Sequence, residues 1–438
     1  MTNQLQFNMT FPKFYFDRSF TFESGLHVIY GESGSGKSAL INQILELEKG
    51  QEYFHLTNIN RPEEFQKVFQ NPDTQIISST LGGELAFSLE CRSNDQEYIS
   101  TKLASLKEKL FFECAEHRHP ATLSGGEKEM LNIVTAFSVN PQLLLIDDGL
   151  SFLNVNGKQN MLGYIHNQIV ETNCIVLWLT SDCNDLQFGK TQWELSLSSF
   201  NEWNGNISPL PAVKHKSQSN EITIACHDLF FSYNGDRDLF NAFNMKIDDF
   251  RALGITGSNG CGKTTLAKLL LHIERSESGS ITLTKAGEKA AMAYLEQFPE
   301  KMIGADSLDT FVQRLVTAGK LDKNKINHAV KNLKNCQLEW EQIRYKTALD
   351  LPWSTLRVVL TIWLLNSDYD LLILDEPTFG LGRQQVLTLT HHLRLYLKNK
   401  HLIIISHDTE FIYTFCDRVF EMDQHTIITE KNNITSNG

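Results

Sequence analysis

The sequence has no apolar run that approaches the roughly 18 residues a helix needs to cross a bilayer. Its first residues, Met1 to Phe7, lack the basic and then apolar layout of a secretory signal. The eight cysteines are scattered, and no two of them stand at CxxC spacing. These absences argue against a membrane-spanning chain and against a disulfide-stabilised secreted one, so we expect a reduced, cytosolic compartment.

Positive charge is also scarce. The 438 residues include 40 Lys and Arg against 52 Asp and Glu, which gives a formal net charge of −12. Binding to nucleic acid depends on neutralising phosphates with basic residues, so we expect no nucleic-acid partner. With 41% hydrophobic residues, the composition is that of a globular protein, and the length allows two or three domains.

The chain does contain two phosphate-binding loops, Gly31–Ser38 and Gly257–Thr264, which share the pattern Gly-four-Gly-Lys-Ser/Thr. Glycines let backbone N–H groups surround phosphates, the lysine reaches the β- and γ-oxygens, and the hydroxyl coordinates Mg²⁺. Each loop follows an apolar strand-like run and opens a helix with apolar periodicity, so the helix dipole also favours the anion. The residues expected to bind nucleotide here are Gly31, Gly34, Gly36, Lys37, Ser38, Gly257, Gly260, Gly262, Lys263, Thr264 and Thr265.

The sequence contains two copies of the same series of motifs. The two loop lysines are 226 residues apart, and glutamines Gln70 and Gln297 are 227 apart. Apolar strands that end in two acids, Leu143–Asp148 and Leu371–Glu376, are 228 apart. A period of this length indicates a duplicated domain. We therefore predict an α/β fold with tandem P-loop NTPase domains at 1–205 and 221–438, joined by a linker at 206–220, each a mainly parallel sheet wrapped by helices.

The stretch Leu-Ser-Gly-Gly-Glu at Leu123–Glu127, 24 residues before Asp147, resembles the signature of ATP-binding-cassette (ABC) ATPases. Membership of that family implies a small helical subdomain in each domain and ATP hydrolysis with Mg²⁺. It also implies head-to-tail pairing of the two domains within the chain, in which the signature of one closes over the ATP on the P-loop of the other. A serine hydroxyl and glycine N–H groups at a helix start suit a γ-phosphate.

The segments Val68–Ile76 and Thr80–Glu90 are similar to the Q-loop and following helix of energy-coupling factor (ECF) and cobalt-importer ATPases. That resemblance implies a peripheral subunit on the cytoplasmic face of the cell membrane, driving uptake of a vitamin or transition metal. Its partners would be a membrane-embedded coupling protein and a substrate-binding subunit. The plainer interpretation is a generic Q-loop followed by a helix whose apolar residues pack inside the domain.

By this resemblance, one ATP site has every required group. It combines Lys263, Thr264, Gln297, Asp375, Glu376 and His407 with the signature residues Ser124, Gly125 and Gly126. Asp375 would hold Mg²⁺ through water, and Gln297 would sense Mg²⁺ and the attacking water. Glu376 would be the general base, His407 would contact the γ-phosphate, and Tyr233 would stack on adenine. The residues placed at Mg²⁺ in the two sites are Ser38, Gln70, Thr264 and Gln297.

The other site combines Lys37, Ser38, Gln70 and Asp147 with several departures from the family pattern. Asp148 replaces the catalytic glutamate, and Ser181 replaces the histidine. The facing signature carries Pro352, which has no N–H, and Trp353, whose indole takes the place of a glycine. Phe7 stands where the first half would place its adenine-stacking residue. We expect this site to bind ATP and turn it over slowly or not at all.

Two other functions remain open. Soluble twin-cassette ATPases that act on ribosomes share the signature, but they carry a long charged helix pair between domains and generally keep both signatures. Fused sugar-importer ATPases typically lose the second P-loop lysine, whereas Lys263 is present. Co-purification with membrane proteins or with ribosomes separates these alternatives.

Overall fold

The computed structural model describes residues 3–14, 16–47, 53–92, 95–112, 115–153, 155–205, 221–233, 238–258, 260–398, 400–424 and 426–428. The chain forms two compact units: Met1–Ile207 with Gly380–Arg383, and Ser208–Phe379 with Gln384–Gly438. The linker predicted at 206–220 lies outside the described residues. The predicted domain limits therefore stay a prediction.

The first unit is built on a six-stranded sheet. In sheet order its strands are β5 (Phe65–Val68), β6 (Leu143–Asp147), β7 (Ile175–Thr180), β3 (Gly25–Tyr30), β8 (Thr191–Leu195) and β9 (Phe200–Glu202). The first five are parallel, and only β9 pairs antiparallel to its neighbour. Every residue of β3, β6 and β7 is buried, as expected for parallel strands covered on both faces.

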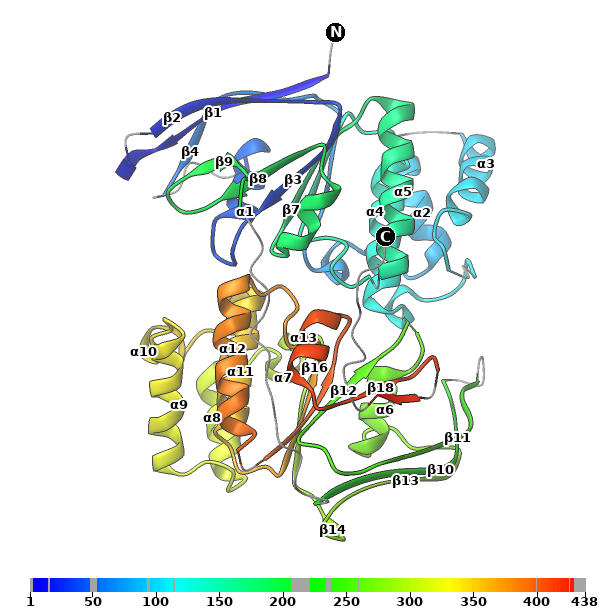
Figure 1. Cartoon of the computed structure of the whole chain (residues 1–438). Helices are drawn as coiled ribbons and strands as arrows, with labels where there is room; N and C mark the ends of the chain where they lie inside the picture. Colours follow the sequence, from blue (N-terminus) through cyan, green and yellow to red (C-terminus); the bar gives the residue numbers. More distant parts are fainter. Residues whose placement is uncertain are drawn as a thin grey trace. The chain divides into compact units, whose positions relative to one another are not determined.

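In the described residues of this unit, a second, antiparallel sheet and five α-helices cover the two faces. The sheet has the order β2 (Phe16–Glu23), β1 (Gln4–Phe11) and β4 (His55–Asn60). The helices are α1 (Lys37–Ile44), α2 (Leu81–Cys91), α3 (Gln96–Lys107), α4 (Gly125–Phe137) and α5 (Val155–Thr172). Residues of β1, β2 and α1 form one core with one face of the parallel sheet, and residues of α2 to α5 form another on the opposite face. Within this unit α2 and α3 lie at the end away from β1 and β2 (Figure 1).

The second unit repeats this order. Its main sheet runs β15 (Met292–Leu295), β16 (Leu371–Asp375), β17 (His401–Ile405), β12 (Ala252–Thr256), β18 (Arg418–Glu421) and β19 (Thr426–Ile428). Its antiparallel sheet runs β11 (Asp238–Ile247), β10 (Ile222–Ser232), β13 (Ser278–Lys285) and β14 (Glu288–Lys289). The matching strand order confirms the predicted tandem α/β fold.

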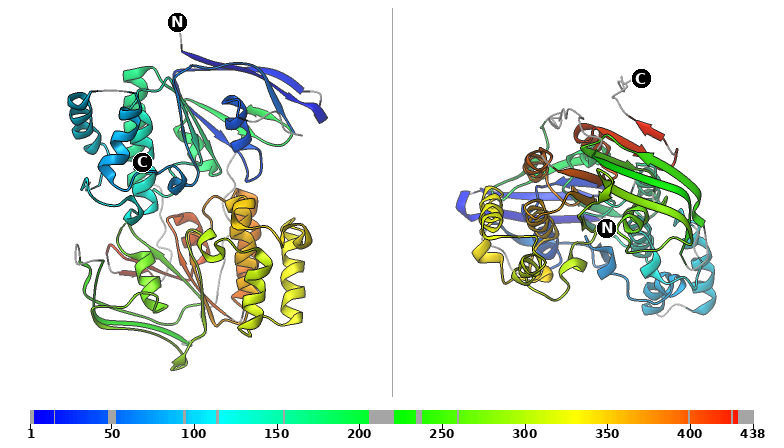
Figure 2. Two further views of the ribbon diagram at one scale, coloured as in Figure 1. Left: turned by 180° about the vertical axis from the view of Figure 1, so that it is seen from behind. Right: turned by 90° about the horizontal axis from the view of Figure 1, so that it is seen from below.

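The helices of the second unit are α6 (Lys263–Leu270), α7 (Glu300–Ile303), α8 (Leu308–Thr317), α9 (Lys323–Asn335), α10 (Trp340–Ile343), α11 (Trp353–Leu365), α12 (Arg383–Tyr396) and α13 (Thr409–Phe415). Within the unit α8 to α10 lie at the end opposite β10 and β11, which can be followed from two further sides in Figure 2. In the described part of the chain, every helix is too short or too polar to span a membrane.

In each unit one strand separates the P-loop strand from the strand that ends in two acids. β7 lies between β3 and β6, and β17 lies between β12 and β16. Because these strands are parallel, their carboxyl ends meet at one edge, where open α/β sheets bind ligands. The residues predicted to bind nucleotide follow those strand ends.

Candidate nucleotide-binding site

The last glycine of each P-loop has a backbone that other residues rarely adopt. Gly36 precedes α1 with φ 96°, and Gly262 precedes α6 with φ 101°. A β-carbon on Gly36 would lie 2.7 Å from the Phe54 ring, and one on Gly262 would lie 2.9 Å from the Phe240 ring. Both positions therefore need glycine. The turn they permit leads directly into a helix start, which suits an anion.

The loop lysines curl back over their own loops. Lys37 Nζ donates to the carbonyl oxygen of Gly31 at 2.8 Å. Lys263 Nζ donates to the carbonyl oxygens of Gly257 and Ser258, both at 2.9 Å. Both lysines are buried. A buried ammonium held at the loop mouth fits a polyphosphate, which would supply the countercharge.

The acid that ends β16 lies beside the P-loop hydroxyl of the second unit. Asp375 Oδ2 accepts a hydrogen bond from Thr264 Oγ1 at 2.7 Å and from the Tyr294 hydroxyl at 3.1 Å. Burial, and next the charge of Glu376, raise the pKa of Asp375 to about 6. A carboxylate and a hydroxyl at this spacing are oxygen ligands of the kind that Mg²⁺ takes, directly or through water.

Glu376 and His407 meet at the same edge. Glu376 adopts a left-handed φ of 50°. Its carboxylate accepts from Ser406 Oγ at 2.8 Å and from the His407 main-chain N–H at 3.0 Å. The His407 ring lies 3.7 Å from the same carboxylate, and burial followed by the charge of Lys263 lowers its pKa to about 3. The His407 imidazole is therefore neutral at neutral pH.

Tyr233 and Phe7 are not equivalent in the structure. The Tyr233 hydroxyl is 3.2 Å from Thr265 Oγ1, at the start of α6, and the side chain stays 44% exposed. Phe7 lies in the middle of β1, is 1% exposed, and packs on Phe20 and Phe22. The assignment of Phe7 as an adenine-stacking residue is wrong, because its ring belongs to the core.

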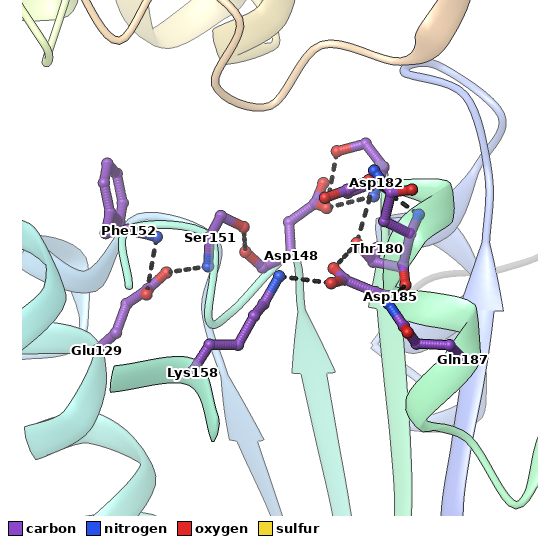
Figure 3. Close-up of polar contacts among 11 residues, drawn as sticks. Glu129, Asp148, Ser151, Phe152, Lys158, Thr180, Asp182, Asp185 and Gln187 are labelled. Carbon is purple, nitrogen blue, oxygen red and sulfur yellow. Dashed lines mark hydrogen bonds and ion pairs between the residues drawn. The ribbon is translucent and has the colours of Figure 1, made fainter. Parts of the chain in front are cut away.

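In the first unit, the Asp148 carboxylate contacts Ser181, Gln70 and Lys37. Its Oδ1 accepts from the Ser181 main-chain N–H at 2.6 Å and from Ser181 Oγ at 2.8 Å. Its Oδ2 accepts from Gln70 Nε2 at 3.3 Å and lies 3.7 Å from Lys37 Nζ. The structure therefore joins Gln70, Lys37 and Asp148 in one contact set. Figure 3 shows Asp148 beside Ser151, whose hydroxyl donates to the main-chain carbonyl oxygen of Asp148.

Asp147 lies next to Asp148 at the end of β6. Burial, and next the charge of Asp148, raise the pKa of Asp147, while a hydrogen bond from Ser38 acts in the opposite direction. The Asp147 carboxyl group and the Ser38 hydroxyl are thus neighbours in the first unit, as Asp375 and Thr264 are in the second.

The two signature segments begin their helices differently. Ser124 caps α4 in a capping box with Glu127, and Gly125 and Gly126 form its first two positions. Pro352 stands at the cap of α11 and makes no side-chain capping bond. The Trp353 ring packs against other rings of its own unit, 5.6 Å from Phe298 and 5.9 Å from Phe379. At the start of α4 the first signature thus has a serine hydroxyl and glycine N–H groups, whereas at the start of α11 the second has the Trp353 indole.

Sequence reasoning missed three residues beside these sites. Tyr294 donates to Asp375, and Arg357 donates to the carbonyl oxygens of Gln297 and Glu376. Glu129 accepts from main-chain N–H groups just after β6. The sequence does contain a signal for Arg357 and Glu129, because each is a charged residue inside the apolar pattern of a signature helix.

The fold and the paired P-loop sites are those of ATP-binding-cassette domains. A family profile described as ABC transporter matches residues 16–151 and 240–379, one stretch in each unit. The chain belongs to this family, whose members hydrolyse ATP. It is thus a tandem ABC ATPase.

Curated relatives share most of the length of this chain. A protein of Treponema denticola, provisionally named as an ABC transporter ATP-binding protein, is 25% identical over 399 residues, which cover 82% of this chain and 78% of that protein. A protein of Streptococcus mutans with the same provisional name is 24% identical over 484 residues and covers 93% and 86%.

Among solved structures, a chain in a model of ribosome-bound archaeal Pelota and ABCE1 matches with a TM-score of 0.67 and 17% identity, covering 91% of this chain and 72% of that one. A structure titled RNase-L Inhibitor matches with a TM-score of 0.58 and 18% identity, covering 91% and 84%. At these identities the likeness shows the fold alone.

Proposed function

We propose that this chain is the ATPase subunit of a membrane importer of the energy-coupling factor type, which takes up a vitamin or a transition metal ion. The observation that carries the proposal is a group of exposed apolar side chains around the first Q-loop. Phe69 is 43% exposed, Ile77 61% and Phe87 43%. Contiguous exposed apolar patches mark interaction sites, and we infer that these three side chains form one. The occupant we infer is an apolar helix of a membrane-embedded coupling protein.

The segment that carries these side chains is held in place by hydrogen bonds. Buried Glu84 accepts from the main-chain N–H of Ile77 at 3.0 Å and of Ser78 at 2.8 Å. Gln75 accepts from the main-chain N–H of Phe69 at 3.1 Å. A fixed apolar surface costs less conformational entropy on binding than a loop that must first become ordered.

Within this function the two units would pair head to tail and form two unequal ATP sites. The P-loop of the second unit, with Glu376 and His407, would face Ser124 and hydrolyse Mg²⁺·ATP. The P-loop of the first unit, with Asp148, would face Trp353 and retain ATP. ATP binds the closed state better than the open one, so binding closes the pair and hydrolysis reopens it. The membrane subunits would follow this cycle from the cytoplasmic face.

The test is a pull-down of the tagged full-length chain from detergent-solubilised membranes of its own host. We expect integral membrane proteins to co-purify with the wild-type chain and to be lost with Ile77→Asp. The matched control is Val170→Asp on α5, because Val170 is an exposed apolar residue at 80% exposure away from the Q-loop. Capture of ribosomes without membrane proteins would contradict the importer and favour a ribosome-acting ATPase.

A further inference from the structure

One buried position holds an acidic side chain in the first unit and a basic side chain in the second. Glu129 on α4 and Arg357 on α11 are 228 residues apart, the same offset as the two signatures. Glu129 is 2% exposed and Arg357 is 0% exposed. Burying a charged side chain is costly unless specific partners compensate it, so each must have a local role.

In the first unit the carboxylate binds N–H groups that follow β6. Glu129 accepts from the main-chain N–H of Ser151 at 3.1 Å and of Phe152 at 2.9 Å (Figure 3). These contacts fix the segment three and four residues beyond Asp148. They do not involve the Asp148 carboxylate, which contacts Ser181, Gln70 and Lys37.

In the second unit the guanidinium binds carbonyl groups instead. Arg357 Nη1 donates to the carbonyl oxygen of Glu376, and Nη2 donates to the carbonyl oxygen of Gln297 at 2.8 Å. The guanidinium also lies over the Phe379 ring, 5.4 Å from its centre. The planar guanidinium therefore bridges the Q-loop and the end of β16, because it contacts the main chain of both Gln297 and Glu376.

We propose that Arg357 is a positioning residue for ATP hydrolysis, which sets the distance between Gln297 and Glu376 through their main-chain carbonyl groups. This inference rests on the proposed role of those two side chains at the attacking water. The planar fork of arginine holds two acceptors in a fixed relation, whereas a lysine ammonium is a single point charge. Glu376 also has a left-handed backbone, a strained conformation that persists only where the surrounding structure holds it.

The test compares Arg357→Met, Arg357→Lys and Glu129→Gln in the full chain. We expect Arg357→Met to lower kcat by about 10²-fold, since a misplacement near 1 Å costs about that much. The KM for ATP should stay within about twofold, because Arg357 does not touch the P-loop residues that hold the nucleotide. Arg357→Lys should recover part of the lost kcat, and Glu129→Gln should keep kcat within about threefold.

A structural role alone would give a different pattern. Arg357→Met leaves the carbonyl oxygens of Gln297 and Glu376 without this donor, so the melting temperature should fall. kcat is therefore measured well below the melting temperature of the variant, where the chain is folded and a purely structural role would leave kcat unchanged. The proposal is overturned if Arg357→Met keeps kcat within threefold, if Met and Lys variants are equally slow, or if kcat falls only in parallel with stability.

Glu376→Gln separates this inference from the function on which it rests. Loss of activity in Glu376→Gln with full activity in Arg357→Met would refute only the positioning role. Unchanged activity in Glu376→Gln would refute the proposed hydrolytic site of the second unit, and the positioning role with it.

Discussion

Replacing Glu376 with glutamine should lower the ATPase rate of the whole chain by about 10²–10⁴-fold, the usual contribution of a general base. The substitution keeps the size of the side chain and can keep one acceptor for the His407 N–H, now 3.0 Å from the carboxylate. It removes the negative charge that would take a proton from water. Folding should be unaffected, which a thermal melt checks.

The matched change in the first unit is Asp148→Asn, and we expect it to alter the rate by less than about threefold. Aspartate is one C–C bond, about 1.5 Å, shorter than glutamate, and a misplacement near 1 Å already costs about 10² in rate. Ser181 and Gln70 also engage both oxygens of this carboxylate, at 2.6 and 3.3 Å. Asp148 is therefore poorly placed to accept a proton from water.

The assay is phosphate release at saturating Mg²⁺·ATP, with wild type, both single variants and the double variant measured side by side. The double variant should be as slow as Glu376→Gln. Equal losses in the two single variants would refute the reasoning, because the two sites would then contribute equally to hydrolysis.

Tyr233→Ala should weaken ATP binding by about 1–3 kcal/mol, the usual value of stacking on a base. Phe7→Ala should instead lower the free energy of unfolding by about 3–5 kcal/mol and leave nucleotide affinity unchanged. Titration with a fluorescent nucleotide measures the first effect, and urea unfolding measures the second. Burial raises the pKa of Glu129 to about 8 from 4.5, so the folded chain keeps a proton that the unfolded chain releases. Stability should therefore fall as pH rises from 4.5 to 8, and urea midpoints of Glu129→Gln should show a shallower fall; an identical slope would contradict this. Trp353→Ala should lower the melting temperature, because the ring packs on two aromatic rings of its own unit; an unchanged melt would mean that these contacts contribute nothing.

The constant offset predicted the duplicated fold because insertions between the repeated strands are small. The P-loops, the paired acids and the second-half histidine follow strand ends, and the shared edge of a parallel sheet brings them together. The same offset gave a wrong equivalence between Phe7 and Tyr233, because these two residues belong to the antiparallel part of each unit, where the strands differ in length. There β10 spans Ile222–Ser232 and β1 only Gln4–Phe11, so equal spacing does not mean equal place.

Arg357 and Tyr294 could not be assigned from sequence for a different reason. Their partners are a main-chain carbonyl group or a side chain on another strand, and a pattern of residue types does not show such contacts. A charged residue in the apolar pattern of a signature helix indicated a buried partner without identifying it. The three-dimensional structure was needed to show that Glu129 binds N–H groups and Arg357 binds carbonyl groups.

The most direct test of unequal sites is the fate of nucleotide retained by the chain after turnover. The full chain is incubated with radiolabelled Mg²⁺·ATP through many turnovers, passed rapidly through a desalting column, and its bound nucleotide is separated by chromatography. We predict about one uncleaved ATP per chain, lost in Lys37→Ala and kept in Lys263→Ala. Retained nucleotide that is all ADP, or that both variants lose equally, would contradict the account.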